Sequence, residues 1–264
     1  MQKIFGYKDP KSVNTLLKDL VTKGYLGRIY STKLLENTKP AIYFLNNNGI
    51  VWIRYRKGEE WKVENEQLDF KYLKKFYEDK HASQIFITHS LSLVEIYLQL
   101  KELEKNSKGK FEYFLSTKTE NWIEEQIHKY TDEDFGEIKN CIPDIFFEKL
   151  KNLDTEEMIS STFFLELFDL HVPRYALRFK VNEYLRFREE VNWKTRYGGI
   201  DGKFSTIIFI FYNQAKLNKT ASIIEERLNE SYDVEDMTFL LTTYERLMSK
   251  GIGAGDIWRE IKEE

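Results

Sequence analysis

The 264-residue sequence is 42% hydrophobic, 31% charged and 15% aromatic, which is enough apolar content to bury a core and too much for a disordered chain. No run approaches the ~18 apolar residues of a transmembrane helix, the N-terminus lacks the apolar region of a signal peptide, and the single cysteine, Cys141, excludes a disulfide framework and a cysteine-built zinc site. We therefore expect a soluble, cytoplasmic globular protein without a membrane partner.

The charge is unevenly distributed along the chain. Residues 1–57 hold eleven Lys/Arg and three acidic residues, a net charge of +8, whereas the remaining residues carry a net charge of −11. A small basic module joined to an acidic body favours a polyanion as the partner of that module, because a polyanion responds to local charge.

The first predicted element is a helix over residues 10–22. Pro10 suits a first helical position, apolar residues recur at helical spacing, and Gly24 ends the helix. Strands are predicted over residues 27–30, 41–45 and 50–54, with a polar loop to residue 39 and a turn at 46–49. This order is typical of a winged helix-turn-helix, in which the helix reads DNA and the loop forms the wing. The candidate DNA contacts are Lys11, Asn14, Thr15 and Lys18 on the helix, and Arg28, Lys33 and Lys39 at the wing.

One part of a winged helix is missing from this pattern. Such a domain normally has one or two helices before the reading helix, whereas nine residues precede Pro10. We expect those helices to have been truncated or to be supplied by a partner. The alternative interpretation is that residues 1–57 form a protein-interaction module that does not touch DNA.

A charged connector is predicted over residues 58–80, and residues 81–264 alternate helices with strands. Helices are expected over residues 83–104, 122–130, 173–191 and 217–229, and strands over 111–115, 142–147, 161–168, 206–211 and 238–241, with a polar link at 152–157 and a helical tail. The alternation predicts an α/β (α+β) domain, a mixed sheet flanked by helices.

Two carboxylates interrupt otherwise apolar strands of this body. Asp144 follows Pro143 within residues 142–147, and Glu166 lies within residues 161–168. A buried carboxylate must be paired, protonated, at a strand end or bound to a cation. Adjacent antiparallel strands would bring the two acids together, which makes them a candidate Mg²⁺ or Mn²⁺ site for phosphodiester chemistry. The alternative is that each acid pairs with a Lys or Arg side chain.

These acids carry a resemblance to a known family. Pro143-Asp144, a link, an apolar strand ending in Glu166 and then a basic helix resemble the core of the PD-(D/E)XK nucleases. Together with the N-terminal module, the chain resembles the replication-relaxation proteins of plasmids and other mobile elements. The matching segments are residues 12–26, 42–49, 143–144, 163–166, 180–184, 207–210 and 239–243. The resemblance implies a winged-helix DNA-binding domain, a nuclease-like domain, and a role in replication initiation or in DNA relaxation.

One position departs from the nuclease pattern. An active nuclease of this type has a lysine two positions after the second acid, where this chain has Phe168. We expect Lys180 or Arg178, from the following helix, to reach back and replace it. Lys180, Tyr184 and Arg188 share one helix face, for which a solvated basic face is the alternative. The candidate catalytic residues are Asp144, Glu166 and Lys180, with Asp144 and Glu166 as metal ligands.

Other polar features carry weaker signals. The four histidines show no metal-ligand spacing, and His89 is expected to pack or to cap a helix. Residues 251–255 lack the Lys-Ser/Thr of a phosphate-binding loop, so no nucleotide cofactor is expected. Cys141 is expected to be a buried hydrophobic residue.

Three functional hypotheses remain open from the sequence. The leading one is a DNA-binding protein of a mobile element with a nuclease-like domain, whose catalytic activity the sequence leaves open. The second is a metal-dependent endonuclease or nickase, and the third is a winged-helix transcriptional regulator. The expected partners are double-stranded DNA, a second copy of the chain, and other replication or mobilisation proteins.

Overall fold

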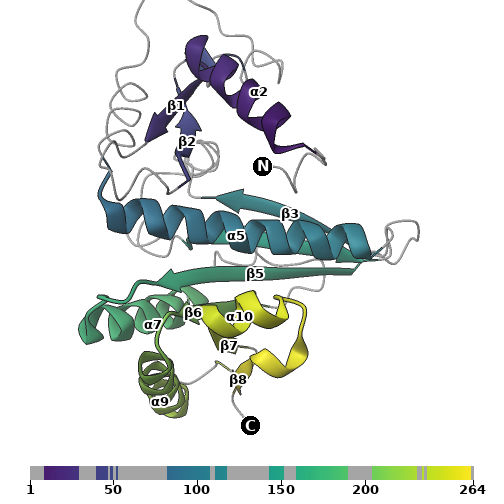
Figure 1. Cartoon of the computed structure of the whole chain (residues 1–264). Helices are drawn as coiled ribbons and strands as arrows, with labels where there is room; N and C mark the ends of the chain where they lie inside the picture. The colour runs from purple at the N-terminus through teal and green to yellow at the C-terminus, as the bar shows by residue number, and fades with distance from the viewer. Residues whose placement is uncertain are drawn as a thin grey trace, which may run out of the picture. The chain divides into compact units, whose positions relative to one another are not determined.

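The structure is a computed structural model with two compact units, residues 1–87 and residues 88–264 (Figure 1). It describes residues 9–29, 40–46, 48–49, 52, 82–107, 111–117, 143–151, 159–189, 204–230, 234 and 237–262. No helix within these ranges is long and apolar enough to cross a membrane. The predicted connector at 58–80, the helix at 122–130 and the link at 152–157 lie outside the described residues, as do Lys33, Lys39, His81, His128 and Cys141.

The first unit begins with the predicted helix, α2 (Pro10–Thr22). The Asp9 side chain caps it by accepting a hydrogen bond from the backbone N–H of Lys11, at 3.0 Å. Val13 and Leu17, one turn apart, are its buried residues. The chain leaves the helix through Gly24, whose φ of +72° favours glycine. The helix prediction is confirmed.

Two short strands, β1 (Leu26–Ile29) and β2 (Ile42–Leu45), form an antiparallel pair after α2. Gly27 lies opposite Phe44, and a Cβ atom on Gly27 would approach the Phe44 ring to 2.2 Å. Glycine is therefore required for the ring to lie across β1.

The strand predicted over residues 50–54 is wrong where the structure describes it. Asn48, Gly49 and Trp52 are helical. The backbone N–H of Gly49 donates to the carbonyl of Asn46 at 2.8 Å, which turns the chain into a helical path directly after β2. At Trp52 the strand propensity of the sequence did not decide the local structure, because that propensity depends on the available neighbours.

The second unit is built on a six-stranded mixed sheet in the order β3-β4-β5-β6-β7-β8. Strands β5, β6 and β7 run parallel, and the other neighbouring pairs are antiparallel. The strands are β3 (Phe111–Thr117), β4 (Ile145–Lys151), β5 (Ile159–Phe168), β6 (Thr206–Phe211), β7 (Thr238–Thr243) and β8 (Arg259–Lys262). The predicted mixed sheet flanked by helices is confirmed.

Helices cover both faces of this sheet. The crossover helices α7 (Arg174–Glu189) and α9 (Gln214–Glu230) share one apolar cluster with the face that includes Phe164 and Phe209. Helices α5 (Gln84–Asn106) and α10 (Tyr244–Lys250) pack with the other face, which includes Leu165 and Ile208. Because both faces are buried, the central strand β6 is an almost continuous apolar run.

The structure differs from the prediction at the start of β4 and in the segment after β7. β4 begins at Ile145, so Pro143 and Asp144 precede it; proline has no backbone N–H for a ladder, which favours this boundary. β7 is followed by α10, by a 3₁₀ turn (Gly255–Ile257) and by a further strand, β8, rather than by a helical tail. Ile261 is buried against the sheet cluster, which stabilises that last strand.

Candidate acid–lysine site at the edge of the sheet

The candidate acids lie at the end of the sheet where strands β5 and β6 finish and β4 begins. Ile145 is paired with Leu165 in the β4–β5 ladder, so Asp144 lies next in register to Glu166. β4 starts at the edge where β5 finishes, because the two strands are antiparallel. The carboxyl ends of parallel strands are where ligands bind in open α/β sheets.

Glu166 is buried, with 5% of its surface exposed, and faces α7. The Lys180 Nζ atom lies 2.8 Å from Glu166 Oε1, and the Tyr184 hydroxyl donates to the same oxygen at 2.8 Å. Lys180 Nζ also lies 3.7 Å from Glu183 Oε2 and 5.5 Å from the centre of the Tyr184 ring. These contacts pair a carboxylate that would otherwise be costly to bury.

Asp144 is held by a different set of partners. The backbone N–H of Leu167 donates to Asp144 Oδ2 at 2.9 Å. The Asp144 carboxylate thus accepts the hydrogen bond that a backbone carbonyl would accept if the β4–β5 ladder continued. His89 Nε2, from α5, lies 3.5 Å from the same oxygen. Asp144 is therefore fixed at the strand end by one backbone group and one imidazole.

His89 bridges two carboxylates. Its Nδ1 atom lies 3.2 Å from Asp169 Oδ1, while its Nε2 atom faces Asp144. The hydrogen bond with Asp144 raises the pKa of His89, burial opposes that effect, and Asp169 adds to the increase. In the charged form, both ring nitrogens are donors and both carboxylates are acceptors.

The turn after β5 is anchored from α9. Lys216 Nζ donates to the carbonyl oxygens of Leu170 and Val172, the latter at 2.8 Å. On the other side, the Tyr212 hydroxyl, directly after β6, donates to Ser92 Oγ on α5 at 2.6 Å. These bonds fix the turn that contains Asp169 and the helix that supplies His89.

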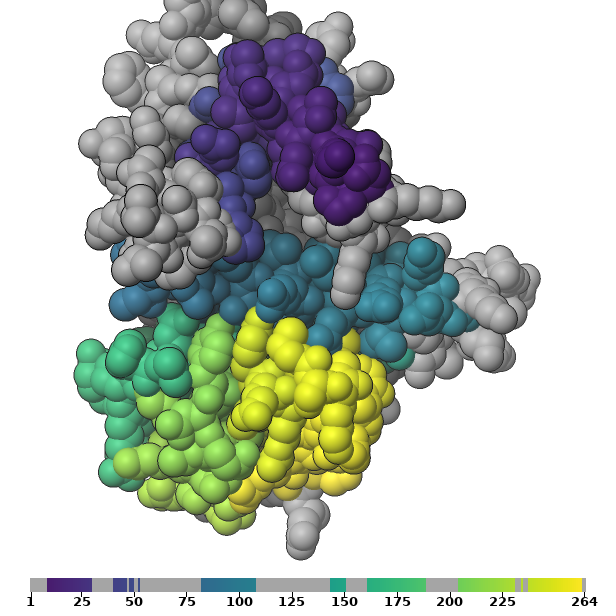
Figure 2. All heavy atoms as spheres, viewed as in Figure 1, coloured from purple at the N-terminus to yellow at the C-terminus, as the bar shows by residue number. Residues whose placement is uncertain are grey.

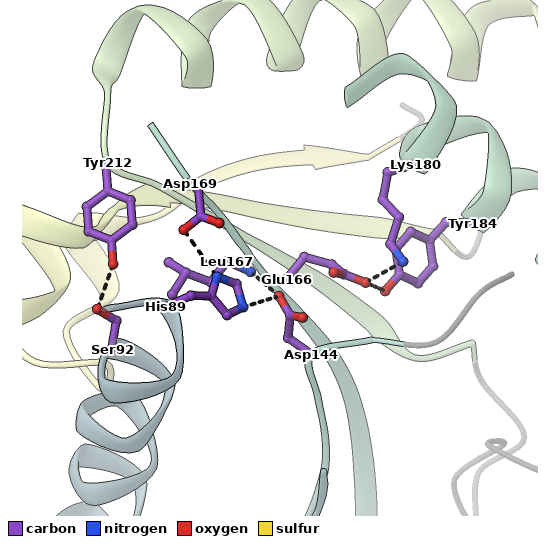
Figure 3. A network of polar contacts seen from close by, with 9 residues as sticks. All are labelled: His89, Ser92, Asp144, Glu166, Leu167, Asp169, Lys180, Tyr184 and Tyr212. Atoms are coloured by element: carbon purple, nitrogen blue, oxygen red, sulfur yellow. Dashed lines mark hydrogen bonds and ion pairs between the residues drawn. The ribbon is translucent and has the colours of Figure 1, made fainter. Parts of the chain in front are cut away.

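Figure 3 shows how the two candidate acids point at this edge. The Glu166 carboxylate points toward Lys180 and Tyr184, and the Asp144 carboxylate points toward His89 and the Leu167 N–H. They are neighbours in register, but each is engaged with its own partners, Glu166 with Lys180 and Asp144 with His89. No group of three or more His, Cys, Asp or Glu residues suited to a metal occurs among the described residues. The two acids are therefore held by helices on opposite faces of the sheet, Glu166 by α7 and Asp144 by α5, and the structure does not show them sharing one cation. Each is a hard oxygen donor, and Mg²⁺ commonly binds one or two carboxylates while keeping several waters.

Phe168 occupies the position where the resembled nucleases have a lysine. It is buried, and its ring centre lies 5.0 Å from those of Phe209 and Phe211. A charged side chain at position 168 would enter this aromatic cluster, whereas Glu166 is paired with a lysine that comes from α7.

The other basic residues singled out on α7 do not join Lys180. Arg178 is exposed, and the Arg188 guanidinium lies 6.0 Å from the centre of the Phe204 ring. His89 and Asp169 were not predicted as site residues. Asp169 had a signal, since it directly follows β5, whereas no sequence spacing connects α5 to the other two elements.

The predicted DNA-contact residues of the first unit are exposed where the structure describes them. Lys11, Asn14, Thr15 and Lys18 are exposed on α2, and Arg28 is exposed on β1. The Thr15 hydroxyl donates to the carbonyl of Lys11 within the helix, at 2.9 Å.

Comparisons with protein-family models, with curated proteins and with solved structures found no match to this chain.

Proposed function

We propose that this chain is a double-stranded DNA-binding protein of a plasmid or another mobile element, acting in replication initiation or DNA relaxation, and that its second unit carries a nuclease-like site. The observation that carries the proposal is the approach of Lys180 to Glu166, beside Asp144 on the neighbouring strand. Two acids and a lysine are the residue types of the resembled nucleases, in which carboxylates suit a divalent cation and a lysine adds positive charge near the reacting phosphate.

Each side chain of the site has a distinct role in this proposal. Asp144 and Glu166 would hold a divalent cation, which supplies Lewis-acid polarisation of the phosphodiester. The Lys180 ammonium would place positive charge where negative charge develops in the transition state. Tyr184 orients Glu166, and His89 orients Asp144, through the contacts already present.

The first unit supports the DNA-binding part of the proposal. A helix with an exposed polar side precedes an antiparallel strand pair, which is compatible with a reading helix and a wing. The basic excess of residues 1–57 would attract the phosphate backbone.

A nicking assay on supercoiled plasmid tests the catalytic part. The full chain should convert supercoiled plasmid to open circles with Mg²⁺ or Mn²⁺ and not with EDTA. An Asp144→Asn protein, purified identically, controls for contaminating nucleases and should be inactive. If the unmodified chain binds duplex DNA and does not nick it, the catalytic part of the proposal is overturned, and the chain is a DNA-binding protein on a non-cleaving scaffold.

A further inference from the structure

The exposed side of α7 combines arginines with aromatic rings. Arg174, Arg178 and Arg186 are exposed, and so are Tyr175, with 77% of its surface accessible, and Phe179, with 52%. At 3.6 residues per turn, these five residues fall on one side of the helix. Figure 2 shows α7, in green, at the surface of the second unit.

The charged side chains described on this side of α7 are all positive. Glu183, the acid of α7 whose side chain is described, is buried and faces Lys180. Within the described residues, no hydrogen bond or ion pair engages the guanidinium groups of Arg174, Arg178 and Arg186. Three exposed arginines on one side of a helix favour a polyanionic ligand.

The aromatic rings specify which polyanion fits. Tyr175 and Phe179 are one helical turn apart, about 6 Å along the axis at 1.5 Å per residue. A duplex keeps its bases stacked inside and presents sugar and phosphate, whereas unpaired bases can stack on exposed rings. Arginines beside the rings would contact the phosphates of the same strand.

A second copy of the chain is a poorer occupant. A two-fold contact would place the same surface against itself, so arginines would face arginines. Like charges at close range cost free energy, which disfavours this contact.

We propose that this side of α7, Arg174, Tyr175, Arg178, Phe179 and Arg186, binds an unpaired DNA strand, with Tyr175 and Phe179 as stacking platforms. The inference rests on the proposed function, because it takes the ligand to be DNA. Lys180 and Tyr184 lie on the opposite, sheet-facing side of α7, so this strand-binding surface is distinct from the acid–lysine site.

Binding of labelled oligothymidine to the full chain, in EDTA, tests the proposal without requiring cleavage. Tyr175→Leu and Phe179→Leu retain apolar volume and remove the ring, and each should weaken oligothymidine binding at least ~5-fold. Tyr175→Phe keeps the ring and should bind within about twofold of the unmodified chain. Tyr97→Leu, at a partly exposed tyrosine of α5, is the matched control and should bind normally.

Charge is tested separately by the salt dependence. For oligothymidine, Arg174→Gln and Arg178→Gln should each reduce the magnitude of the negative slope of log affinity against log salt by about 0.7. Binding of a duplex of equal length should change little, since we assign duplex binding to α2.

The proposal is overturned if the leucine variants bind oligothymidine as tightly as the unmodified chain, or if duplex and oligothymidine binding fall together. It is also overturned if these variants change only the oligomeric state, which would identify a protein contact. Failure of the unmodified chain to nick plasmid would overturn the nuclease and leave this binding result standing.

Discussion

Lys180 Nζ and Glu166 Oε1 lie 2.8 Å apart, joining helix α7 to strand β5 at the edge where Asp144 also lies. Glu166 is 5% exposed, and the Lys180 side chain is 15% exposed. The pair is therefore largely removed from water, and each charge depends on the other.

Removing one member of this pair should destabilise the second unit. Lys180→Met removes the ammonium group from the buried Glu166 carboxylate, and we expect it to cost roughly 2–4 kcal/mol of unfolding free energy. The double variant Lys180→Met with Glu166→Gln removes both charges and should lose less than the two single variants together. Urea unfolding of the four proteins measures this coupling, and strictly additive losses would show that the contact contributes nothing.

The same residues should control nicking. If the unmodified chain nicks plasmid, Lys180→Ala and Glu166→Ala should each slow it by at least ~100-fold, because each removes a group needed at the reacting phosphate. Duplex binding by α2 should be unchanged, which a mobility-shift assay checks. Glu225→Gln, at an exposed ion pair with Arg259, is the control and should nick at the normal rate. Retained activity in Lys180→Ala would remove Lys180 from the mechanism.

The His89 bridge gives stability a defined pH dependence. Because Asp144 and Asp169 raise the pKa of His89 in the folded state, the contribution is fully present below the unfolded pKa of about 6.5. It is lost as the pH rises through the raised folded-state value. The free energy of unfolding of the unmodified chain minus that of His89→Gln should thus be largest at acidic pH and shrink toward alkaline pH. A difference that grows with pH would contradict this assignment.

The strand and helix pattern of the second unit could be predicted from the sequence because the apolar periods there are strong. β6 is an almost unbroken apolar run between two helices of clear amphipathic spacing, which is typical of a buried parallel strand. β8 could not be predicted, since its sequence is mostly charged and one buried residue, Ile261, links it to the core.

Some residues of the candidate site could likewise be predicted from the sequence, and others could not. Asp144 and Glu166 stand out as charges in apolar strands, and Lys180 stands out only after Phe168 is seen in place of a lysine. His89 gave no signal, because its partners come from two strand ends far along the chain. Contacts between distant elements require the sheet order, which local periodicity does not contain.

DNA binding by α2 should be electrostatic and dependent on salt. If residues 1–57 neutralise about four phosphates, the slope of log affinity against log salt should be roughly −3.6 on duplex DNA. Lys11→Gln and Lys18→Gln, on the exposed side of α2, should each reduce its magnitude by about 0.9. Lys23→Gln is the matched control, because Lys23 is already paired with Asp19 at 2.7 Å, and it should change the slope less. A slope near zero, or normal binding after deletion of residues 1–57, would exclude this surface.

Restoring a lysine at position 168 should harm the protein rather than improve it. Phe168 is 8% exposed and stacks with Phe211, so Phe168→Lys would bury an ammonium in an aromatic cluster and should cost about 3 kcal/mol or more. Phe168→Leu keeps the site apolar and should cost less, about 1–2 kcal/mol, which separates the effect of charge from that of lost ring contacts. Thermal unfolding and nicking are measured on both variants. Faster nicking by a stably folded Phe168→Lys protein would show that Lys180 is a poor substitute, and would contradict the role given to α7 here.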